Sequence, residues 1–329
     1  MSAAVLVVGP SWVGDMVMAQ SLFMRLKQQD PEAPIDVLAP GWSLPLIARM
    51  PEVRRGIEMP LGHGEFGFGV RRRLGQSLRG NGYTQAIVLP GSWKSALTPF
   101  FAGIPRRTGY RGELRYGLLN DIRRRAPGTT ARQFVALAGP GDGLPQPRLH
   151  VEPGEALACA GRLGLKPGGA VALMPGAEYG PAKRWPAEHF GALAKLLGEA
   201  GTPSWVFGSA KESTLGDAIC QASGGAAINL CGKTSLTDVV DLAAQCKAVV
   251  SNDSGLMHVA AAAGAPVVAI YGSSDPGHTP PLTDRKSIHW LHLSCSPCFE
   301  RTCPLYHYRC LRDLSPQAVR DGLSALVSL

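Results

Sequence analysis

The segment SNDSGLMH, residues 251–258, places a carboxylate, hydroxyls, a glycine and an imidazole where an apolar run gives way to a run of small residues. We interpret it as the junction of a strand and a helix, whose first N–H groups lack main-chain partners and attract anions. Ser254 is expected at the N-cap, and Gly255 leaves room for a phosphate. His258 adds a ring N–H one turn later. Asp and Ser are also ordinary capping residues, so a purely structural role stays open.

A second loop of this kind is MPGAEYGPAKRWPAEHF, residues 174–190. It also follows an apolar strand and precedes a helix, and it carries Lys183. A lysine in this position can neutralise a diphosphate that lies on the neighbouring helix terminus. By itself Lys183 could equally be a solvated surface residue. Two anion-suited loops at one edge of a sheet favour a nucleotide diphosphate.

Residues 7–16, VVGPSWVGDM, contain neither the GxGxxG pattern of dinucleotide-binding folds nor the GK[ST] ending of a P-loop. Asp15 lies where the first strand gives way to the first helix. A carboxylate there either stabilises the start of the helix or serves as a general base. The sequence has no Asp-x-Asp pair for a metal–diphosphate bridge. We therefore expect no metal and no other cofactor in the reaction.

The elements that position these residues alternate between strands and helices. This βα alternation predicts two mostly parallel sheets covered by helices, with ligands beyond the carboxyl ends of the strands. Prolines at 127, 140, 145 and 147 place a domain junction near residue 150. We predict an α/β protein with two Rossmann-like domains, 1–150 and 151–329, and a last helix that closes the second domain or packs back on the first. The predicted strands are 3–9, 35–40, 85–91, 170–176, 203–209, 226–232 and the two apolar runs within 248–272, and the predicted helices are 16–29, 43–51, 95–104, 187–201, 212–224, 235–246 and 315–329.

Composition and charge narrow the class of protein. A chain of 329 residues that is 45% hydrophobic can bury two substantial cores. No apolar run approaches the roughly 20 residues of a membrane span, and the first residues are too short and uncharged for a signal peptide, so a cytoplasmic protein is expected. Residues 1–150 hold 19 Lys and Arg against 10 Asp and Glu, whereas residues 151–329 hold 14 against 15. The basic half is either a solvated surface or the binding side for an anionic partner.

Four of the eight cysteines are clustered in CSPCFERTCPLYHYRC, as Cys295, Cys298, Cys303 and Cys310, with His307 among them. The spacing C-x2-C-x4-C-x6-C is compatible with zinc, although zinc sites more often separate two pairs by a longer loop. A compact reduced loop and a disulfide-bonded loop are the alternatives. The sequence leaves the three open.

Five segments together resemble a known family: GPSWVGDMVMAQ, LPGSWKSAL, MPGAEYGPAKRWP, FGSAKE and SNDSGLMHVAAAAGAPVVAIYG. Their order and type are similar to those of the ADP-heptose:lipopolysaccharide heptosyltransferases over nearly the whole chain. With the cysteine-rich segment they are most similar to members that add the second heptose of the inner core. The resemblance implies an inverting glycosyltransferase of GT-B architecture, with two Rossmann-like domains facing each other across a cleft. The donor then binds the C-terminal domain and the acceptor the N-terminal domain.

The resemblance also assigns roles to residues of this sequence. Asp15 corresponds to the family's proposed catalytic base, and Lys183 to the lysine that contacts the donor diphosphate. Glu212 corresponds to a glutamate near the donor ribose. The family's nucleotide-binding loop matches Asp253, Ser254, Gly255, Leu256 and His258, other donor contacts fall at Glu178, Tyr179 and Thr234, and basic residues facing the acceptor fall at Lys94 and Arg115.

The implied reaction moves a heptose from ADP-L-glycero-D-manno-heptose to the first heptose of the lipopolysaccharide inner core, at the inner membrane surface. The anionic acceptor accounts for the basic first half, and the segments 62–73 and onward to Arg125 are candidates for gripping it. The alternatives are a heptosyltransferase acting on the Kdo–lipid A acceptor and a nucleotide-sugar enzyme of the same fold, such as an epimerase. A nucleic-acid-binding protein is disfavoured, because no aromatic residues alternate with the basic ones and no known binding module is visible.

Overall fold

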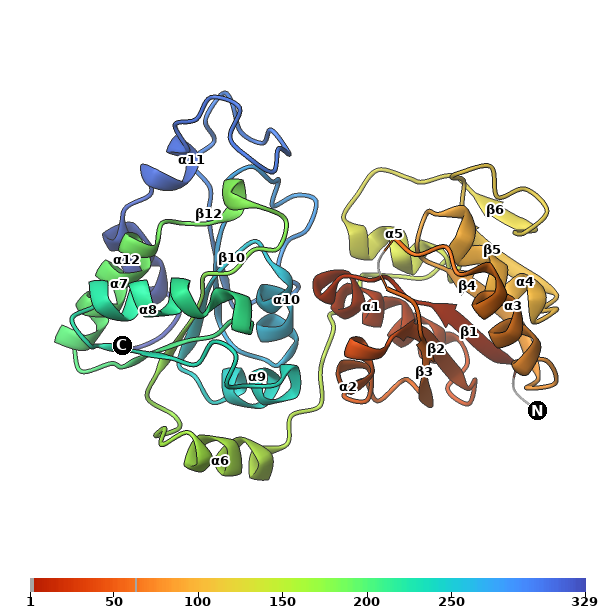
Figure 1. Ribbon diagram of the computed structural model, residues 1–329, viewed down its shortest axis with the longest axis horizontal. Helices are drawn as coiled ribbons and strands as arrows, with labels where there is room; N and C mark the ends of the chain where they lie inside the picture. The colour runs from red at the N-terminus through yellow and green to blue at the C-terminus, as the bar shows by residue number, and fades with distance from the viewer. Residues whose placement is uncertain (1–2, 63) are drawn as a thin grey trace. The chain divides into compact units, whose positions relative to one another are not determined.

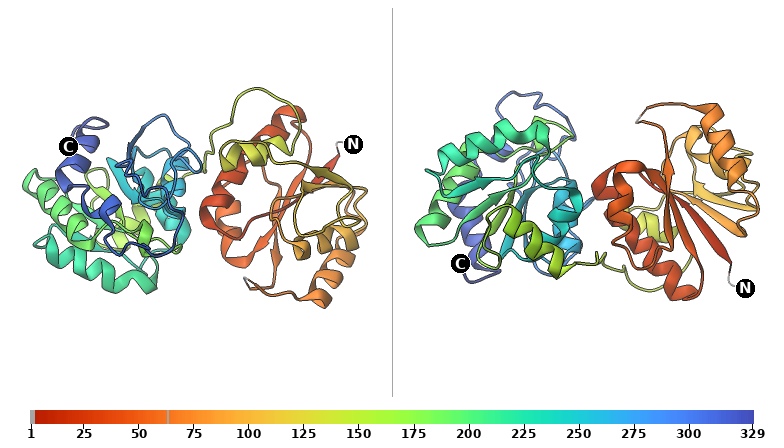
Figure 2. Two further views of the ribbon diagram at one scale, coloured as in Figure 1. Left: turned by 90° about the horizontal axis from the view of Figure 1, so that it is seen from above. Right: turned by 60° about the horizontal axis from the view of Figure 1, so that its bottom comes forward.

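The computed structural model describes residues 3–62 and 64–329. They fall into two compact units, which divide between Pro147 and Arg148. Each unit is an α/β structure built on a parallel six-stranded sheet with helices packed around it (Figures 1 and 2). The chain passes from one unit to the other through an irregular segment between α5 and α6. Among the described residues, no helix is both long enough and apolar enough to cross a membrane.

The first unit holds a sheet of strand order β3-β2-β1-β4-β5-β6, and every neighbouring pair is parallel. Its strands are β1 (Ala4–Val8), β2 (Ile35–Pro40), β3 (Arg55–Met59), β4 (Tyr83–Val88), β5 (Arg106–Tyr110) and β6 (Asp121–Arg123). Its helices are α1 (Val13–Gln29), α2 (Leu44–Ile47), α3 (Phe68–Ser77), α4 (Leu97–Phe101) and α5 (Thr130–Ala136), with short 3₁₀ turns η1 (Gly41–Ser43) and η2 (Trp93–Ala96).

The second unit repeats this plan with the order β12-β11-β10-β7-β8-β9, again parallel throughout. Its strands are β7 (Val171–Met174), β8 (Ser204–Val206), β9 (Ala227–Asn229), β10 (Ala248–Asn252), β11 (Val267–Ile270) and β12 (Lys286–His289). Its helices are α6 (Pro153–Arg162), α7 (Ala187–Glu199), α8 (Ser213–Ala222), α9 (Leu236–Ala244), α10 (Gly255–Ala262), α11 (Arg309–Arg312) and α12 (Pro316–Ser324), with η3 (Pro181–Lys183) and η4 (Ala210–Glu212).

Both sheets have the strand order of a doubly wound Rossmann fold. The order reverses between β1 and β4 in the first unit, and between β7 and β10 in the second. Loops that leave the carboxyl ends of these two pairs diverge to opposite faces, so ligands bind in the crevice between them. The predicted α/β class with two parallel sheets is confirmed.

The central strands are predominantly apolar because helices cover both faces of the sheet. Val249 and Val250 of β10 and Val268 of β11 are fully buried. The last helix, α12, lies in the second unit, where Val319 and Leu323 join the core and α12 packs against α7.

The elements that the sequence did not predict are polar or short. β3 (RGIEM) and β5 (RRTGY) carry arginines, and their register comes from pairing with the inner strands β2 and β4. The predicted loop 62–73 is half helical, since α3 begins at Phe68; His63 lies outside the described residues. α1 begins at Val13 rather than residue 16, so Asp15 falls inside its first turn.

Candidate active site

The two anion-suited loops meet at the reversal point of the second sheet. Asn252, the last residue of β10, is fully buried, and its side-chain amide joins them. Its Oδ1 accepts a hydrogen bond from Trp185 N at 3.0 Å, and its Nδ2 donates to Pro175 O at 2.7 Å. One side chain therefore holds both ends of the loop 175–185 against β10. The segment SNDSG includes Asn252, but nothing in the sequence indicated that its side chain holds both ends of the neighbouring loop.

Lys183 lies at the centre of this arrangement. Its Nζ donates to Asp253 Oδ2 at 2.5 Å, and the two side chains are only 17% and 4% exposed. The ring of Tyr179 lies under the same ammonium group, 4.9 Å from Nζ to the ring centroid. The guanidinium carbon of Arg301 is also 5.4 Å from that ring, and Tyr179 donates from its hydroxyl to Phe299 O. The lysine is thus held in place before any ligand binds.

His258 is buried one turn into α10. Burial lowers the pKa of its imidazole to about 4, with the charge of Asp253 opposing this shift and that of Lys183 adding to it. The ring is therefore neutral at pH 7 and can donate one N–H. Ser254 occupies the N-cap position, as predicted, but its side chain makes no capping hydrogen bond to the helix. The start of α10 keeps its anion-attracting character.

The remaining predicted donor residues lie on the loops after β7, β8 and β9. Glu212 ends η4, and its carboxylate accepts hydrogen bonds from the N–H and hydroxyl of Ser209 at 2.7 and 3.0 Å. The same carboxylate lies against Gly176, where a Cβ would stand only 1.8 Å from Oε1. A larger residue at 176 would displace the Glu212 carboxylate from this position. Glu178 is exposed, and the buried hydroxyl of Thr234 has no hydrogen-bond partner among the described residues.

In the first unit, Asp15 lies half-buried in the first turn of α1, directly after the carboxyl end of β1. The positive end of the helix dipole favours a carboxylate at this position. Lys94, in the loop after β4, donates from Nζ to Glu65 O at 3.1 Å and so attaches that loop to the segment before α3. Asp15 and Lys94 therefore lie beyond the two strands at which the order of the first sheet reverses.

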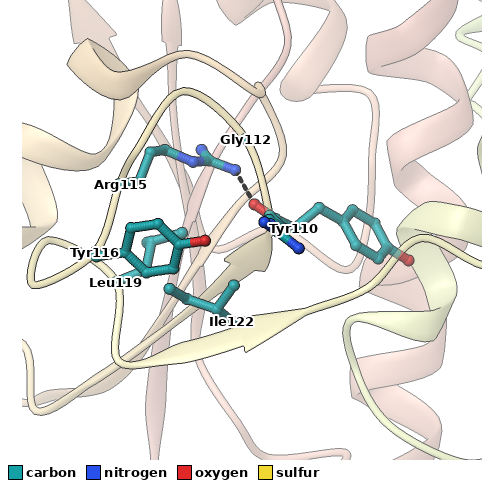
Figure 3. A pocket seen from close by; sticks show the side chains of 7 residues that line it. Tyr110, Gly112, Arg115, Tyr116, Leu119 and Ile122 are labelled. Atoms are coloured by element: carbon teal, nitrogen blue, oxygen red, sulfur yellow. Dashed lines mark hydrogen bonds between the residues drawn. The ribbon is translucent and has the colours of Figure 1, made fainter.

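Arg115 is buried and engaged by the main chain. It is 2% exposed, and its guanidinium donates to three main-chain carbonyls, those of Pro90 at 2.6 Å, Tyr110 at 2.5 Å and Ser92 at 3.5 Å. Figure 3 shows it pointing toward the Tyr110 carbonyl, beside a small pocket that Tyr116 also lines. In this structure the buried side chain is engaged by main-chain carbonyls and positions the loop after β4. Its predicted contact with the acceptor stays a prediction.

The clustered cysteines line one small pocket with His307. None of the eight cysteines forms a disulfide, so the disulfide alternative is wrong. Burial, and then the neighbouring Cys295, Cys303 and Cys298, raise the pKa of the Cys310 thiol to about 11. Within residues 3–62 and 64–329, no group of three or more His, Cys, Asp or Glu side chains is arranged to hold a metal ion.

Each unit is a doubly wound α/β fold with charged and polar residues at the reversal point of its sheet, and comparison with known proteins names the class. Residues 71–309 match glycosyltransferase family 9 (heptosyltransferase). The chain belongs to this family and is a heptosyltransferase.

Two relatives that match over 98% of the chain are lipopolysaccharide heptosyltransferases 2. The chain is 46% identical to lipopolysaccharide heptosyltransferase 2 of Escherichia coli K12 and 47% identical to that of Salmonella typhimurium, over 98% of both chains in each case. The solved structure of E. coli ADP-heptose LPS heptosyltransferase II superposes with a TM-score of 0.87 and 44% identity, over 99% of this chain and 98% of that one. The predicted family, the resemblance to its members that add the second heptose, and the GT-B fold are confirmed.

Proposed function

We propose that the second unit binds ADP-heptose and that the first unit presents the acceptor to Asp15. The reaction of this heptosyltransferase is the transfer of heptose to the first heptose of the lipopolysaccharide inner core. Lys183, His258 and the start of α10 are the groups that hold the diphosphate of the donor. The observation that carries this assignment is the half-buried ammonium of Lys183 at the reversal point of the second sheet.

The roles of these residues follow from the negative charge that develops on the diphosphate as the donor heptose is transferred. The acceptor hydroxyl oxygen attacks the anomeric carbon of the donor heptose, the bond from that carbon to the diphosphate oxygen breaks, and ADP leaves. Lys183 and the N–H groups of α10 stabilise the negative charge that collects on the departing diphosphate. Because these donors are preorganised, no step requires them to reorient.

His258 contributes a hydrogen bond rather than a charge. Its imidazole is neutral at pH 7, since burial holds its pKa near 4. A neutral ring donates one N–H to a phosphate oxygen without adding a cation to the buried Lys183–Asp253 pair. Asp253 orients the lysine, because it accepts one of the three ammonium hydrogens and leaves the others for the diphosphate.

Asp15 acts as the general base on the acceptor side. It takes the proton of the attacking hydroxyl as the new glycosidic bond forms, opposite the departing ADP. Carboxylates in the first turn of a helix are weak bases, which suffices when the proton leaves late in a loose transition state. The basic surface of the first unit attracts the phosphates or carboxylates of the acceptor. We place the enzyme in the cytoplasm, at the inner membrane surface.

The test is heptose transfer from ADP-heptose in EDTA, for the wild type and for Asp15→Asn. The acceptor already carries one heptose. We expect the wild type to be active and the variant to lose about 100-fold or more in kcat, within the range for general-base catalysis, while ADP affinity is unchanged. Retained activity in the variant contradicts the role of Asp15. Wild-type transfer only to the acceptor without heptose contradicts the acceptor assignment.

A further inference from the structure

A ridge of aromatic side chains on the first unit is not used by the donor, the base or the core. It consists of Trp93, Phe66, Phe68, Phe101 and Phe100, whose rings contact one another in that order. Successive ring centroids are 5.7, 6.0, 5.5 and 5.5 Å apart. All but Phe101 are 37–49% exposed. Exposed aromatic residues scattered singly need no explanation, but a continuous ridge marks an interaction site.

The ridge is held rigidly. Gly67 adopts φ 52° between two of the rings, and a Cβ there would stand 2.5 Å from the side chain of Leu61. The buried guanidinium of Arg71 donates to the carbonyls of Phe66 at 2.7 Å and Glu65 at 3.3 Å. The two helices that carry the ridge, α3 and α4, pack side by side (Figure 1). The exposed rings are therefore a built feature of the fold.

Cationic side chains border the ridge. Arg72 and Arg73 are exposed on α3, next to Phe68 in the chain, and Arg79 is exposed just after that helix and donates to Phe101 O at 2.9 Å. The guanidinium carbon of Arg107 lies 5.6 Å from the centre of the Phe100 ring.

Two carboxylates nearby are already engaged by main-chain N–H groups. That of Glu65 accepts from Gly62 N at 3.0 Å, and that of Glu113 from Trp93 N at 2.7 Å. Rings bordered by arginines suit a surface that is apolar just beneath a layer of negative charge.

We infer that this ridge docks the enzyme on an anionic lipid bilayer. The inference rests on the proposed function, in which the acceptor is a lipid whose acyl chains stay in the membrane. Aromatic rings partition into the interfacial layer, and arginines gain from anionic headgroups. Phe66, Phe68 and Trp93 follow the carboxyl ends of β3 and β4, the edge of the sheet at which Asp15 follows β1. The far end of the ridge, at Phe100, lies by Arg107 at the start of β5. Docking there brings the sugar of a membrane-held acceptor to the side of the sheet that carries the base.

The test separates docking from catalysis by using two acceptors. The full chain and the variant Phe66→Ser/Phe68→Ser are floated with vesicles of phosphatidylethanolamine and phosphatidylglycerol, and with vesicles of phosphatidylcholine alone. We expect wild-type binding to the anionic vesicles only, and a loss of about tenfold or more in the variant. Its kcat/KM should fall by a similar factor with acceptor embedded in vesicles, and by a much smaller factor with a water-soluble acceptor freed of its acyl chains. Leu157→Ser, an exposed apolar residue on α6 of the second unit, is the matched control and should change neither quantity.

Three results overturn the docking proposal. The first is equal vesicle binding by wild type and variant. The second is an equal loss of activity on the soluble acceptor, which makes the ridge a sugar-binding platform. The third is a lower molecular mass of the variant in solution, which shows that a second copy of the chain covers the ridge. Vesicle binding needs no turnover, so a wild type that binds vesicles but transfers heptose to neither acceptor refutes the proposed function and not the docking.

Discussion

Removing the charge of Lys183 is expected to weaken both the fold of the second unit and its hold on ADP. The substitution Lys183→Met keeps an unbranched side chain of similar length and deletes the ammonium group. It leaves the Asp253 carboxylate, whose side chain is 4% exposed, without its ionic partner. The Thr279 hydroxyl lies 3.5 Å from Oδ1 and is too far away to replace a charge-assisted bond at 2.5 Å.

The magnitude follows from this burial. Breaking a buried ion pair by removing one partner costs about 3–5 kcal/mol, because the other charge stays desolvated. For a unit of this size that corresponds to a melting temperature lower by about 10 °C. Adding Asp253→Asn should recover about 2 kcal/mol, since no buried charge then remains. Affinity for ADP should fall about 10- to 150-fold in Lys183→Met, as expected for loss of a hydrogen bond between charged groups, whereas affinity for adenosine should not change.

Calorimetric titration with ADP and adenosine, together with thermal unfolding in the absence of ligand, measures these quantities. Lys195→Met, an exposed lysine on α7, is the matched control and should leave both unchanged. Unaltered ADP affinity in Lys183→Met would refute the assignment of the diphosphate to this lysine. A double variant that is less stable than Lys183→Met would refute the reasoning about the buried charge.

Two further substitutions test residues that act through burial. His258 has a pKa near 4 in the folded chain against an ordinary value of 6.5, so the unfolded chain binds its proton first and stability is lost as pH falls from about 7 to 4. Between pH 7 and pH 4 the free energy of unfolding of His258→Gln, measured with urea, should fall by about 3 kcal/mol less than that of the wild type. Equal losses in the two proteins would contradict a buried neutral ring. Arg115→Met should lower stability by about 3 kcal/mol and reduce kcat/KM for the acceptor with unchanged ADP affinity, because two carbonyls of the loop after β4 and that of Tyr110 at the end of β5 lose their anchor. Rescue by Arg115→Lys would argue against this positioning role, since one ammonium group cannot span those carbonyls.

Much of the fold was accessible from local patterns. Inner strands such as β1 and β11 are continuous apolar runs, and such runs predict strands buried on both faces whichever neighbours they acquire. Outer strands such as the edge strand β3 and its counterpart β5, which lies next to the other edge, are polar, and their pairing depends on the inner strands already in place. Periodicity cannot reveal a strand whose stability comes from its neighbours.

The sequence by itself predicted the chemistry that we propose for the donor edge. SNDSG and PAKRWP indicate an anion site and a lysine, and the βα alternation brings them to one sheet edge. Only the tertiary structure decided which groups work together. Asn252 clamps residues that precede it by 77 and 67 positions, and Tyr179 meets Arg301. An arginine in a basic segment is expected at the surface, but packing buries Arg115 so that it anchors main-chain carbonyls. Residue type and spacing describe what a side chain can do, whereas burial and partners arise only when distant segments pack, and these decide what it does.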